Sequence, residues 1–400
     1  MHARVLSSAI LGIDAYEVEI EANLTPRPMP LFVTVGLPEG AVKESKERVV
    51  AAIKNSEFRF PSKKVVVNLA PADIRKEGSA FDLPIAIGIL AALNQVSDHY
   101  LDNLWLLGEL SLDGSLRPIR GALPIAISAS QSGVKGLIVP RENAREAAVA
   151  EGVRVAGASS LREVVDLLNG ETELQKTEVD LDELFRESLN YPIDFEEVKG
   201  QEHVKRAMEV AAAGGHNVVL IGPPGSGKTM LAKRLPTILP HLTLDEALET
   251  TKIHSVAGQL PTASGIIATR PFRSPHHTIS DAGLIGGGTV PKPGEVSLSH
   301  HGVLFLDELA EFRKNVLEVM RQPMENSEVT IARAAITVSY PANFQLVAAT
   351  NPCPCGYVTD PNNDCSCSPQ SIQKYMSRIS GPLLDRIDLH VDVPATGRKI

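Results

Sequence analysis

Hydrophobic and polar residues alternate in the first part of the chain, and this period of two predicts strands that bury one face. Three segments show the alternation most clearly, at 16–24, 31–37 and 63–71. We expect a helix at 38–55, between the last two of these strands. The apolar residues before position 16 lead directly into the first strand without the cleavage-site pattern of a signal peptide.

The pattern then changes to alternating helices and strands. Residues 83–93 are almost entirely apolar but too few to cross a bilayer, so they predict a buried helix. We expect Ser79, just before this segment, to cap that helix. Residues 106–119 predict a hairpin whose type I′ turn is Asp113-Gly114. Helices and strands continue to about residue 170, which predicts one α/β domain over residues 1–170.

Composition indicates a boundary after this domain. Residues 171–195 are rich in acidic residues and lack a clear apolar period, so they predict a linker. A second α/β pattern occupies residues 196–400. With 43% hydrophobic and 22% charged residues, the chain is expected to be a cytoplasmic protein without a membrane segment. A net charge of −9 gives no sign of a broad basic surface, but it leaves room for a local basic groove.

A nucleotide-binding motif opens the second domain. An apolar strand is followed by GPPGSGKT and a helix, in the pattern G-x-x-x-x-G-K-[ST]. Its glycines let backbone N–H groups approach phosphate oxygens, and the helix N-terminus adds partial positive charge. Lys228 would contact the β and γ phosphates of ATP, and Thr229 would hold Mg²⁺. The expected binding residues are Gly222, Pro223, Pro224, Gly225, Ser226, Gly227, Lys228 and Thr229.

Three later segments carry candidate catalytic residues. The apolar strand GVLFL ends in Asp307 and Glu308, which would orient the magnesium shell and polarise the attacking water, respectively. Another apolar strand ends in Asn351, which is suited to position the water or sense the γ phosphate. Arg386 lies in SGPLLDRIDLH, either as a catalytic arginine or as a surface residue in a salt bridge.

All four cysteines of the chain lie within residues 353–367, which we call the knuckle. The C-x-C, nine residues, C-x-C spacing supplies four soft ligands, enough for tetrahedral zinc, although it is not a standard C-x₂-C pattern. Four protein ligands would close the coordination sphere, so the metal would be structural. The alternative is four free thiols. The candidate ligands are Cys353, Cys355, Cys365 and Cys367.

These motifs, in this order, resemble the AAA+ ATPases of the magnesium-chelatase clade, and within it the ComM/YifB group. GPPGSGKT, LFLDE, NPCPCGY and RPFRSPHHTISDAGLIGGG carry the resemblance, which covers essentially the whole chain. It implies adenine packing around Val198 and Gln201. It also implies that Arg386 reaches the ATP of a neighbouring subunit, so that the chain forms a ring of identical subunits, expected to be a hexamer. Members of the group continue into a helical lid beyond residue 400.

The resemblance further implies two elements that face the pore of the ring. One is an insert at about 254–301, with Arg270 and Arg273 as candidate DNA contacts. The other is a hairpin at about 328–343, with Arg333 near its tip. In a symmetric ring a few such arginines per subunit would form a basic pore that tracks phosphates without reading sequence.

The first domain resembles the Lon protease domain, which has the fold of ribosomal protein S5. On that alignment the nucleophile position falls on Ala80, one residue after Ser79, and the lysine position falls on Leu123 or its neighbours. The Ser–Lys dyad is therefore absent, and an ATP-dependent protease is disfavoured. The fold class expected for the whole chain is α/β, with a non-proteolytic Lon-like α+β domain followed by an AAA+ domain.

The function implied by the resemblance is an ATP-driven DNA motor that performs branch migration or helicase action in recombination and natural transformation. DNA would be single-stranded or branched and bound without sequence specificity. The alternative is a chelatase-like ATPase that remodels a metal-inserting or other protein partner. Stimulation of the ATPase rate by DNA would distinguish the DNA motor from the chelatase-like ATPase.

Overall fold

The computed structural model describes residues 1–26, 31–37, 40–72, 76, 78–173, 175–188, 191–261, 265–288, 291–333 and 337–395. The chain divides into two compact units. Unit 1 consists of Met1–Leu184 together with His254–Ile266, and unit 2 consists of Phe185–Ile253 together with Ile267–Ile400. The predicted insert at 254–301 is therefore divided between the two units. Residues 334–336 of the predicted hairpin at 328–343 lie outside the described residues.

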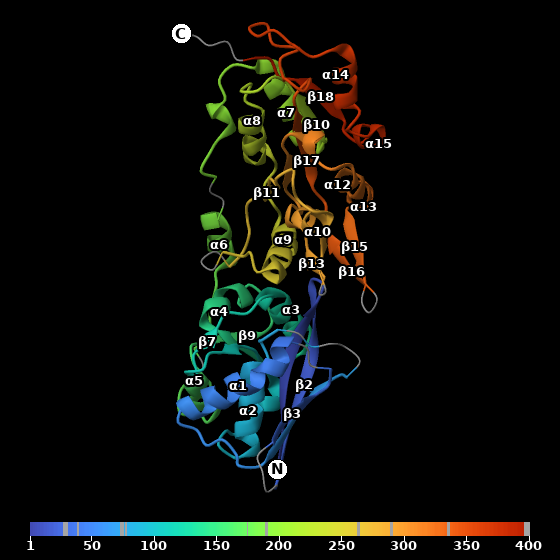
Figure 1. The fold of residues 1–400 in the computed structure, drawn as a ribbon. Helices are drawn as coiled ribbons and strands as arrows, with labels where there is room; N and C mark the ends of the chain where they lie inside the picture. Colours follow the sequence, from blue (N-terminus) through green and yellow to red (C-terminus); the bar gives the residue numbers. More distant parts are fainter. Residues whose placement is uncertain are drawn as a thin grey trace. The chain divides into compact units, whose positions relative to one another are not determined.

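Unit 1 contains a seven-stranded sheet in the order β3-β4-β2-β1-β5-β8-β9 (Figure 1). β1 and β2 form a long antiparallel hairpin, and β5, β8 and β9 are parallel. Alternation explains β2, because Val18, Ile20, Ala22 and Leu24 are at most 2% exposed while acidic residues occupy positions between them. The strands are β1 His2–Leu11, β2 Asp14–Thr25, β3 Leu31–Val35, β4 Lys64–Ala70, β5 Leu104–Leu106, β8 Gly136–Pro140 and β9 Arg154–Ala158.

Helices pack on this sheet, and α2 is buried along its whole length, as its uniform apolar sequence predicts. Its one acidic residue, Asp82, is fully buried and accepts hydrogen bonds from Arg48 Nε (2.6 Å) and the Leu110 N–H (3.2 Å). The helices of unit 1 include α1 Gly40–Asn55, α2 Asp82–Ala92, α3 Ala122–Ser132, α4 Arg141–Ala147 and α5 Leu161–Leu168.

Two local predictions in unit 1 are wrong. Ser79 does not cap α2, because the N-cap residue is Phe81 and the Ser79 hydroxyl donates to the Glu109 carboxylate instead. The turn between β6 Glu109–Leu110 and β7 Leu116–Arg117 is not type I′. Of its two central residues only Gly114 has a positive φ, 88°, and its N–H bonds back to the Ser111 carbonyl. This is the geometry of a longer loop with a glycine in the left-handed region.

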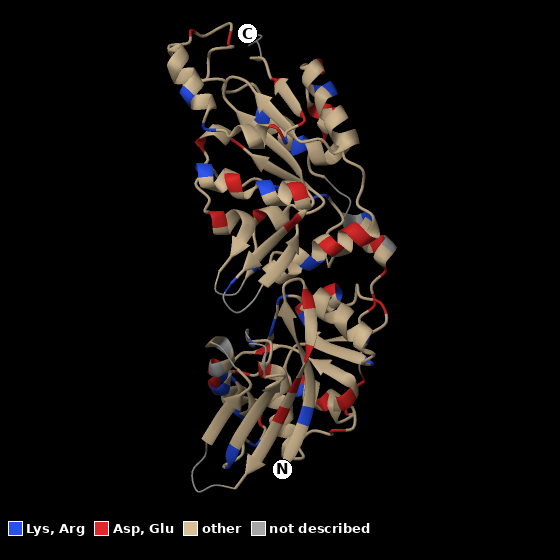
Figure 2. Cartoon of the chain, turned by 90° about the vertical axis from the view of Figure 1, so that its right-hand side faces the viewer, with Lys and Arg blue, Asp and Glu red and all other residues tan. Residues whose placement is uncertain are grey.

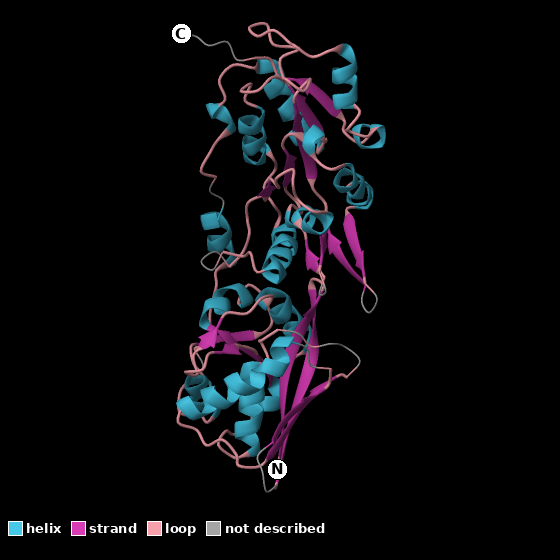
Figure 3. Cartoon of the chain, viewed as in Figure 1, coloured by secondary structure: helices cyan, strands magenta, loops and turns pink. Residues whose placement is uncertain are grey.

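Unit 2 contains a parallel five-stranded sheet in the order β11-β14-β17-β10-β18. Strands are drawn in magenta in Figure 3. β14 and β17 are buried at every position, as expected for parallel strands covered on both faces. The carboxyl ends of parallel strands meet at one edge of a sheet, so residues that follow them gather there. The strands are β10 Val218–Ile221, β11 Phe272–Arg273, β14 Val303–Leu306, β17 Gln345–Thr350 and β18 Leu389–Asp392.

Helices and two small hairpins surround this sheet. β15 Glu328–Ala332 and β16 Thr337–Pro341 pair as an antiparallel hairpin, at the place expected from the sequence. A second pair, β12 Gly286–Gly287 and β13 Lys292–Pro293, lies within the predicted insert. The helices that lie wholly or partly in unit 2 are α6 Leu181–Ser188, α7 Glu202–Gly214, α8 Lys228–Arg234, α9 Leu244–Ala257, α10 Asp281–Ile285, α11 Glu295–Leu298, α12 Lys314–Val319, α13 Arg321–Asn326, α14 Pro369–Met376 and α15 Gly381–Leu384. Within the described residues, no helix combines the length and apolar character needed to cross a membrane.

Candidate nucleotide-binding and hydrolysis site

The phosphate loop, residues 222–229, connects the buried strand β10 to α8. Gly222 is required by close packing, because a Cβ on it would lie 2.2 Å from the Val393 carbonyl oxygen. Gly227, immediately before α8, has a φ of 91°, which L side chains rarely adopt. The two glycines therefore hold the loop close to the sheet and turn it into the helix, the path that a phosphate-binding loop needs.

Lys228 lies inside the loop. Its Nζ donates to the Gly222 and Pro223 carbonyl oxygens at 2.7 and 2.9 Å, and it is 3.4 Å from Asn351 Oδ1. Burial lowers the pKa of Lys228, while the charge of Asp307 acts in the opposite direction. The structure thus brings together the lysine and Asn351, which are 123 positions apart in the sequence.

Thr229 and Asp307 also meet. The Thr229 hydroxyl donates to Asp307 Oδ2 at 2.7 Å, and the Glu308 N–H donates to Asp307 Oδ1 at 3.0 Å. A hydroxyl and a carboxylate next to a phosphate loop are oxygen ligands of the kind that Mg²⁺ prefers. The two residues therefore fit the predicted magnesium position.

Glu308 has a partner that the sequence analysis missed. Its backbone is in the left-handed region, with a φ of 53°, and its Oε2 lies 3.1 Å from His277 Nδ1. His277 follows β11, which pairs with β14 in parallel, so both residues leave the same edge of the sheet. The sequence gives little sign of this contact, because β11, which positions His277, has only two residues and shows no alternation of apolar and polar residues.

The predicted adenine contacts lie beside the loop. Val198 is 1% exposed and belongs to the core beneath β10, and Gln201 Nε2 donates to the Ser226 carbonyl at 2.8 Å. Among the described residues, Gln201 Oε1 and Ser226 Oγ are buried without a hydrogen-bond partner. Buried oxygens of this kind normally have a hydrogen-bond partner, so the two atoms fit a site that binds a polar ligand.

Arg386 follows α15 and precedes β18. Its guanidinium pairs with Glu325 and donates to the Pro382 carbonyl at 2.5 Å, and its side chain is 26% exposed. These partners within the described residues do not include Lys228 or Glu308. The structure therefore does not bring Arg386 to the phosphate loop of its own chain.

The two arginines of the predicted insert are held by internal acceptors. Arg270 donates to the carbonyls of Pro240 (2.5 Å) and His301 (2.7 Å), and lies 3.5 Å from Glu246. Arg273 makes a bidentate pair with Glu295 at 2.6 and 2.7 Å. In this structure both arginines therefore stabilise unit 2 through these contacts. Arg333, in contrast, is exposed just after β15.

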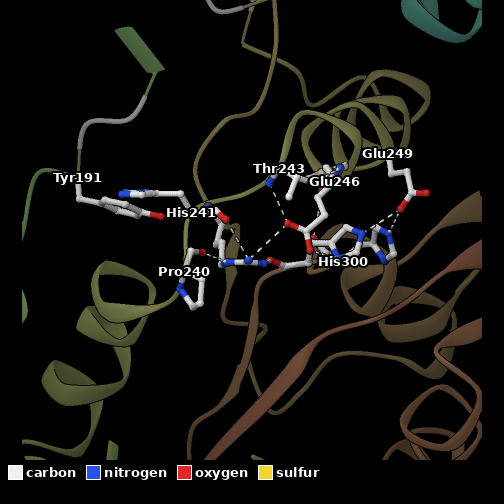
Figure 4. Close-up of polar contacts among 10 residues, drawn as sticks. Tyr191, Pro240, His241, Thr243, Glu246, Glu249 and His300 are labelled. Atoms are coloured by element: carbon white, nitrogen blue, oxygen red, sulfur yellow. Dashed lines mark hydrogen bonds and ion pairs between the residues drawn. The ribbon is translucent and has the colours of Figure 1, made fainter. Parts of the chain in front are cut away.

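A second group of histidines and carboxylates lies at the other end of β14 (Figure 4). Glu249 Oε2 is 3.3 Å from His300 Nε2 and 2.9 Å from His301 Nε2. Burial lowers the pKa of His300 to about 4, and its Nδ1 accepts the Asn343 N–H at 3.0 Å. The neutral ring thus carries its proton on Nε2, the atom that faces Glu249. The two histidines and Glu249 thus form a hydrogen-bonded group, which we call the clamp.

The four cysteines of the knuckle converge on one point. The sulfur of Cys353 lies 3.4 Å from that of Cys355 and 3.8 Å from that of Cys365, and the latter two are 3.6 Å apart. All four sulfurs lie within 4.8 Å of one another. Sulfurs bound at about 2.3 Å to tetrahedral zinc are about 3.8 Å apart, so the cluster fits that ion.

In the Lon-like unit, the residues at and beside the predicted dyad positions are held by internal contacts. Ser79 donates to Glu109, and Leu123, at the predicted lysine position, is fully buried. The Leu123 N–H donates to Glu146 Oε1 at 2.9 Å, and burial raises the pKa of Glu146. These contacts within the described residues pair Ser79 with a carboxylate rather than with the lysine of a Ser–Lys dyad.

The parallel sheet, the phosphate loop and the Thr229–Asp307 pair define a P-loop ATPase. Residues 194–399 match the family model of magnesium chelatase, subunit ChlI, and residues 20–143 match that of subunit ChlI of Mg-chelatase. The chain is 47% identical over 394 residues to Competence protein ComM of Haemophilus influenzae, covering 98% of this chain and 76% of that protein. It is 44% identical over 390 residues to YifB of Escherichia coli, covering 98% and 75%. The chain belongs to the ComM/YifB group of magnesium-chelatase-like AAA+ ATPases.

A more distant likeness is to a Lon protease. Lon protease 2 of Bacillus subtilis is 28% identical over 192 residues, which cover 41% of this chain and 33% of that protein. The expected fold class, a Lon-like domain followed by an AAA+ domain, is confirmed. A shared fold does not carry the peptidase activity with it, because activity depends on the residues of the site.

Proposed function

We propose that this chain is the subunit of a ring-forming, ATP-driven DNA motor that moves branched DNA during recombination and the uptake of DNA. The observation that carries the proposal is the short connection between an exposed arginine and the hydrolysis site. Arg333 directly follows β15, and β16 returns to residue 341. β17 then begins at Gln345 and leads into Asn351, which contacts Lys228. Displacement of the hairpin by DNA would therefore be transmitted to the phosphate loop along one strand.

Each residue of the site has a defined task in this proposal. Lys228 binds the phosphates of ATP, and Thr229 and Asp307 hold Mg²⁺, which neutralises charge on the phosphate oxygens. Glu308 orients and polarises the attacking water, and Asn351 positions it against the γ phosphate. Because Arg386 contacts none of these groups in its own chain, we assign it to the site of the adjacent subunit.

DNA binding would be local rather than spread over the surface. Acidic and basic residues are interspersed along unit 2 (Figure 2), in keeping with the net charge of −9. A ring multiplies one exposed arginine by the number of its subunits, which concentrates positive charge where the hairpins meet. Arg333 is the candidate that we retain for this contact, and the name of the competence protein ComM agrees with a role on DNA.

Zinc in the knuckle belongs to the same proposal. The four sulfur positions fit a closed tetrahedral site, so the ion would hold structure and would not take part in hydrolysis.

The test is the ATPase rate of the protein with and without a branched DNA. We expect strong stimulation that falls with added salt, since phosphate contacts release counterions. Arg333→Ala should lose most of the stimulation and keep the basal rate. Arg206→Ala is the matched control, because Arg206 is an exposed arginine of the same unit outside the hairpin. A healthy basal rate without stimulation would favour remodelling of a protein partner, the activity class of a chelatase subunit.

A further inference from the structure

The knuckle touches the phosphate loop. Gly356, between the second and third cysteines, has a φ of 86°, and a Cβ built on it would lie 2.6 Å from Cδ and 2.9 Å from Cγ of Pro224. Pro224 is part of the loop between β10 and α8. The ring of Pro224 therefore rests directly against the backbone of the knuckle, with no room for a side chain between them.

A second connection runs through Asn351. This residue contacts Lys228 and stands two positions before Cys353, which is completely buried at the start of the knuckle. The Gly356 N–H donates to the Cys353 carbonyl at 3.0 Å, so a single tight turn fixes both contacts with the loop. Asn351 precedes Cys353 and Gly356 follows it, so the position of Cys353 determines where both residues lie.

The described hydrogen bonds in the rest of the knuckle are local. Residues 361–364 are all exposed, and between Cys355 and Cys365 the structure shows turns instead of a helix or strand. The hydrogen bonds there are local, from Asn362 and Asn363 to Asp360 at 2.8 Å. A segment without a core of its own depends on its cross-link for order, as other small metal-closed loops do.

We propose that zinc bound by the four cysteines holds the phosphate loop in its nucleotide-binding form, so that zinc and nucleotide each raise the protein's affinity for the other. The inference deepens the proposed function, because it rests on the nucleotide site described above. Linkage requires the two effects to be equal: the factor by which zinc raises ADP affinity is the factor by which ADP raises zinc affinity. Couplings between sites are typically about 5- to 150-fold, and we expect roughly tenfold here.

The experiment uses the full chain and needs no DNA. The dissociation constant of fluorescently labelled ADP is measured for zinc-loaded protein and for protein stripped by a chelator. The zinc affinity is then measured against a chromophoric chelator with and without saturating ADP. We expect ADP to bind roughly tenfold more weakly to the stripped protein, and zinc to bind more tightly by the same factor when ADP is present.

Two variants separate the contact from the metal. Gly356→Ala should retain zinc but weaken ADP binding several-fold, because its Cβ would collide with Pro224. Gly215→Ala is the matched control: Gly215 also has a positive φ, 65°, but a Cβ there meets nothing within 4 Å. The Gly215→Ala protein should bind ADP with the affinity of the wild type.

Several results would overturn the inference. They are a protein that binds no zinc, equal ADP affinity with and without zinc, or a zinc affinity that ADP does not change. The comparison of wild-type protein with and without ADP requires no substitution, so a variant that fails to fold does not block the test. An ATPase that DNA does not stimulate would count against the DNA motor and leave this inference intact.

Discussion

The two units use their polar side chains in opposite ways. In unit 1 the acidic groups near the former peptidase position are closed in: Asp82 is fully buried against Arg48, and Glu146 accepts bonds from Leu123 and Ser255. In unit 2 the side chain of Glu308 is 55% exposed and has one partner, His277. A carboxylate that accepts hydrogen bonds from several buried donors stabilises the fold. A carboxylate that is exposed and has a single partner can still contact a substrate.

This difference agrees with the prediction from the sequence that the Lon-like domain lacks a peptidase dyad. Unit 1 retains the sheet and helices of the Lon-like domain, but the positions that would carry nucleophile and base are Ala80 and the buried Leu123. Its polar network serves the packing of α2 and α3. The candidate hydrolysis residues lie at the carboxyl edge of the sheet in unit 2.

The largest expected effect concerns Arg386. Arg386→Ala should lower the ATPase rate by about 10³-fold or more, the range found for arginine fingers. Lys228→Ala should also be inactive. A mixture of the two variants should recover activity, because the intact phosphate loop of an Arg386→Ala subunit then lies next to the intact arginine of a Lys228→Ala subunit. No recovery in the mixture would show that Arg386 acts within its own chain or only stabilises it through Glu325.

A smaller effect is expected at His277, which holds Glu308 in place. His277→Ala should lower kcat about tenfold with little change in KM, because misplacing a catalytic group affects the transition state more than substrate binding. His277→Asn should restore part of the rate, since its amide nitrogen can donate to Glu308 from a similar position. Equal loss in both variants, with a raised KM, would contradict a positioning role.

The clamp at His300 shows that a closed network can also occur in unit 2, and its effect should be on stability. The pKa of His300 falls from 6.5 to about 4 on folding, so the folded protein resists protonation. The free energy of unfolding should be unaffected above pH 6.5 and should fall by about 3 kcal/mol as the pH decreases towards 4. Glu249, whose pKa is also lowered, acts in the same direction.

Urea unfolding at pH 7.5 and pH 5 measures this effect. His300→Gln should reduce the pH dependence of the circular dichroism transition. The only tryptophan of the chain, Trp105, lies buried in unit 1, so its fluorescence reports that unit separately. A pH dependence unchanged by the substitution would assign the effect to other groups.

The smallest effect is expected at Ser79. Ser79→Ala removes a hydroxyl that bonds Glu109 in unit 1, so the ATPase rate should stay within about twofold of the wild type. Neither protein should digest casein. Peptidase activity that the substitution abolishes would contradict the comparison between the units.

Much of the architecture follows from local patterns. Alternation predicts β2, uniform apolarity predicts the buried α2, and the glycine-rich motif predicts the loop before Lys228. Parallel topology then explains why residues after β10, β14 and β17 meet. The turn at Gly114 was predicted as the wrong type because the dipeptide Asp-Gly suits more than one loop length.

The features that the sequence did not predict depend on contacts between residues that are far apart in the chain. β11 is two residues long, so nothing local shows that His277 will leave the sheet beside Glu308. Arg270 and Arg273 resemble free basic residues in the sequence, but carbonyls and Glu295 accept their hydrogen bonds in the fold. The contact of Gly356 with Pro224 requires the three-dimensional arrangement of two loops and has no sequence signature.

The most direct test of the central claim is ATP-dependent displacement of a strand from a branched DNA junction by the full chain. The account predicts displacement with ATP and magnesium, none without ATP, and none with Lys228→Ala. The Arg333→Ala variant should hydrolyse ATP at the basal rate but displace little DNA. Vigorous ATP hydrolysis by the wild-type protein with neither displacement nor stimulation by DNA would contradict the account.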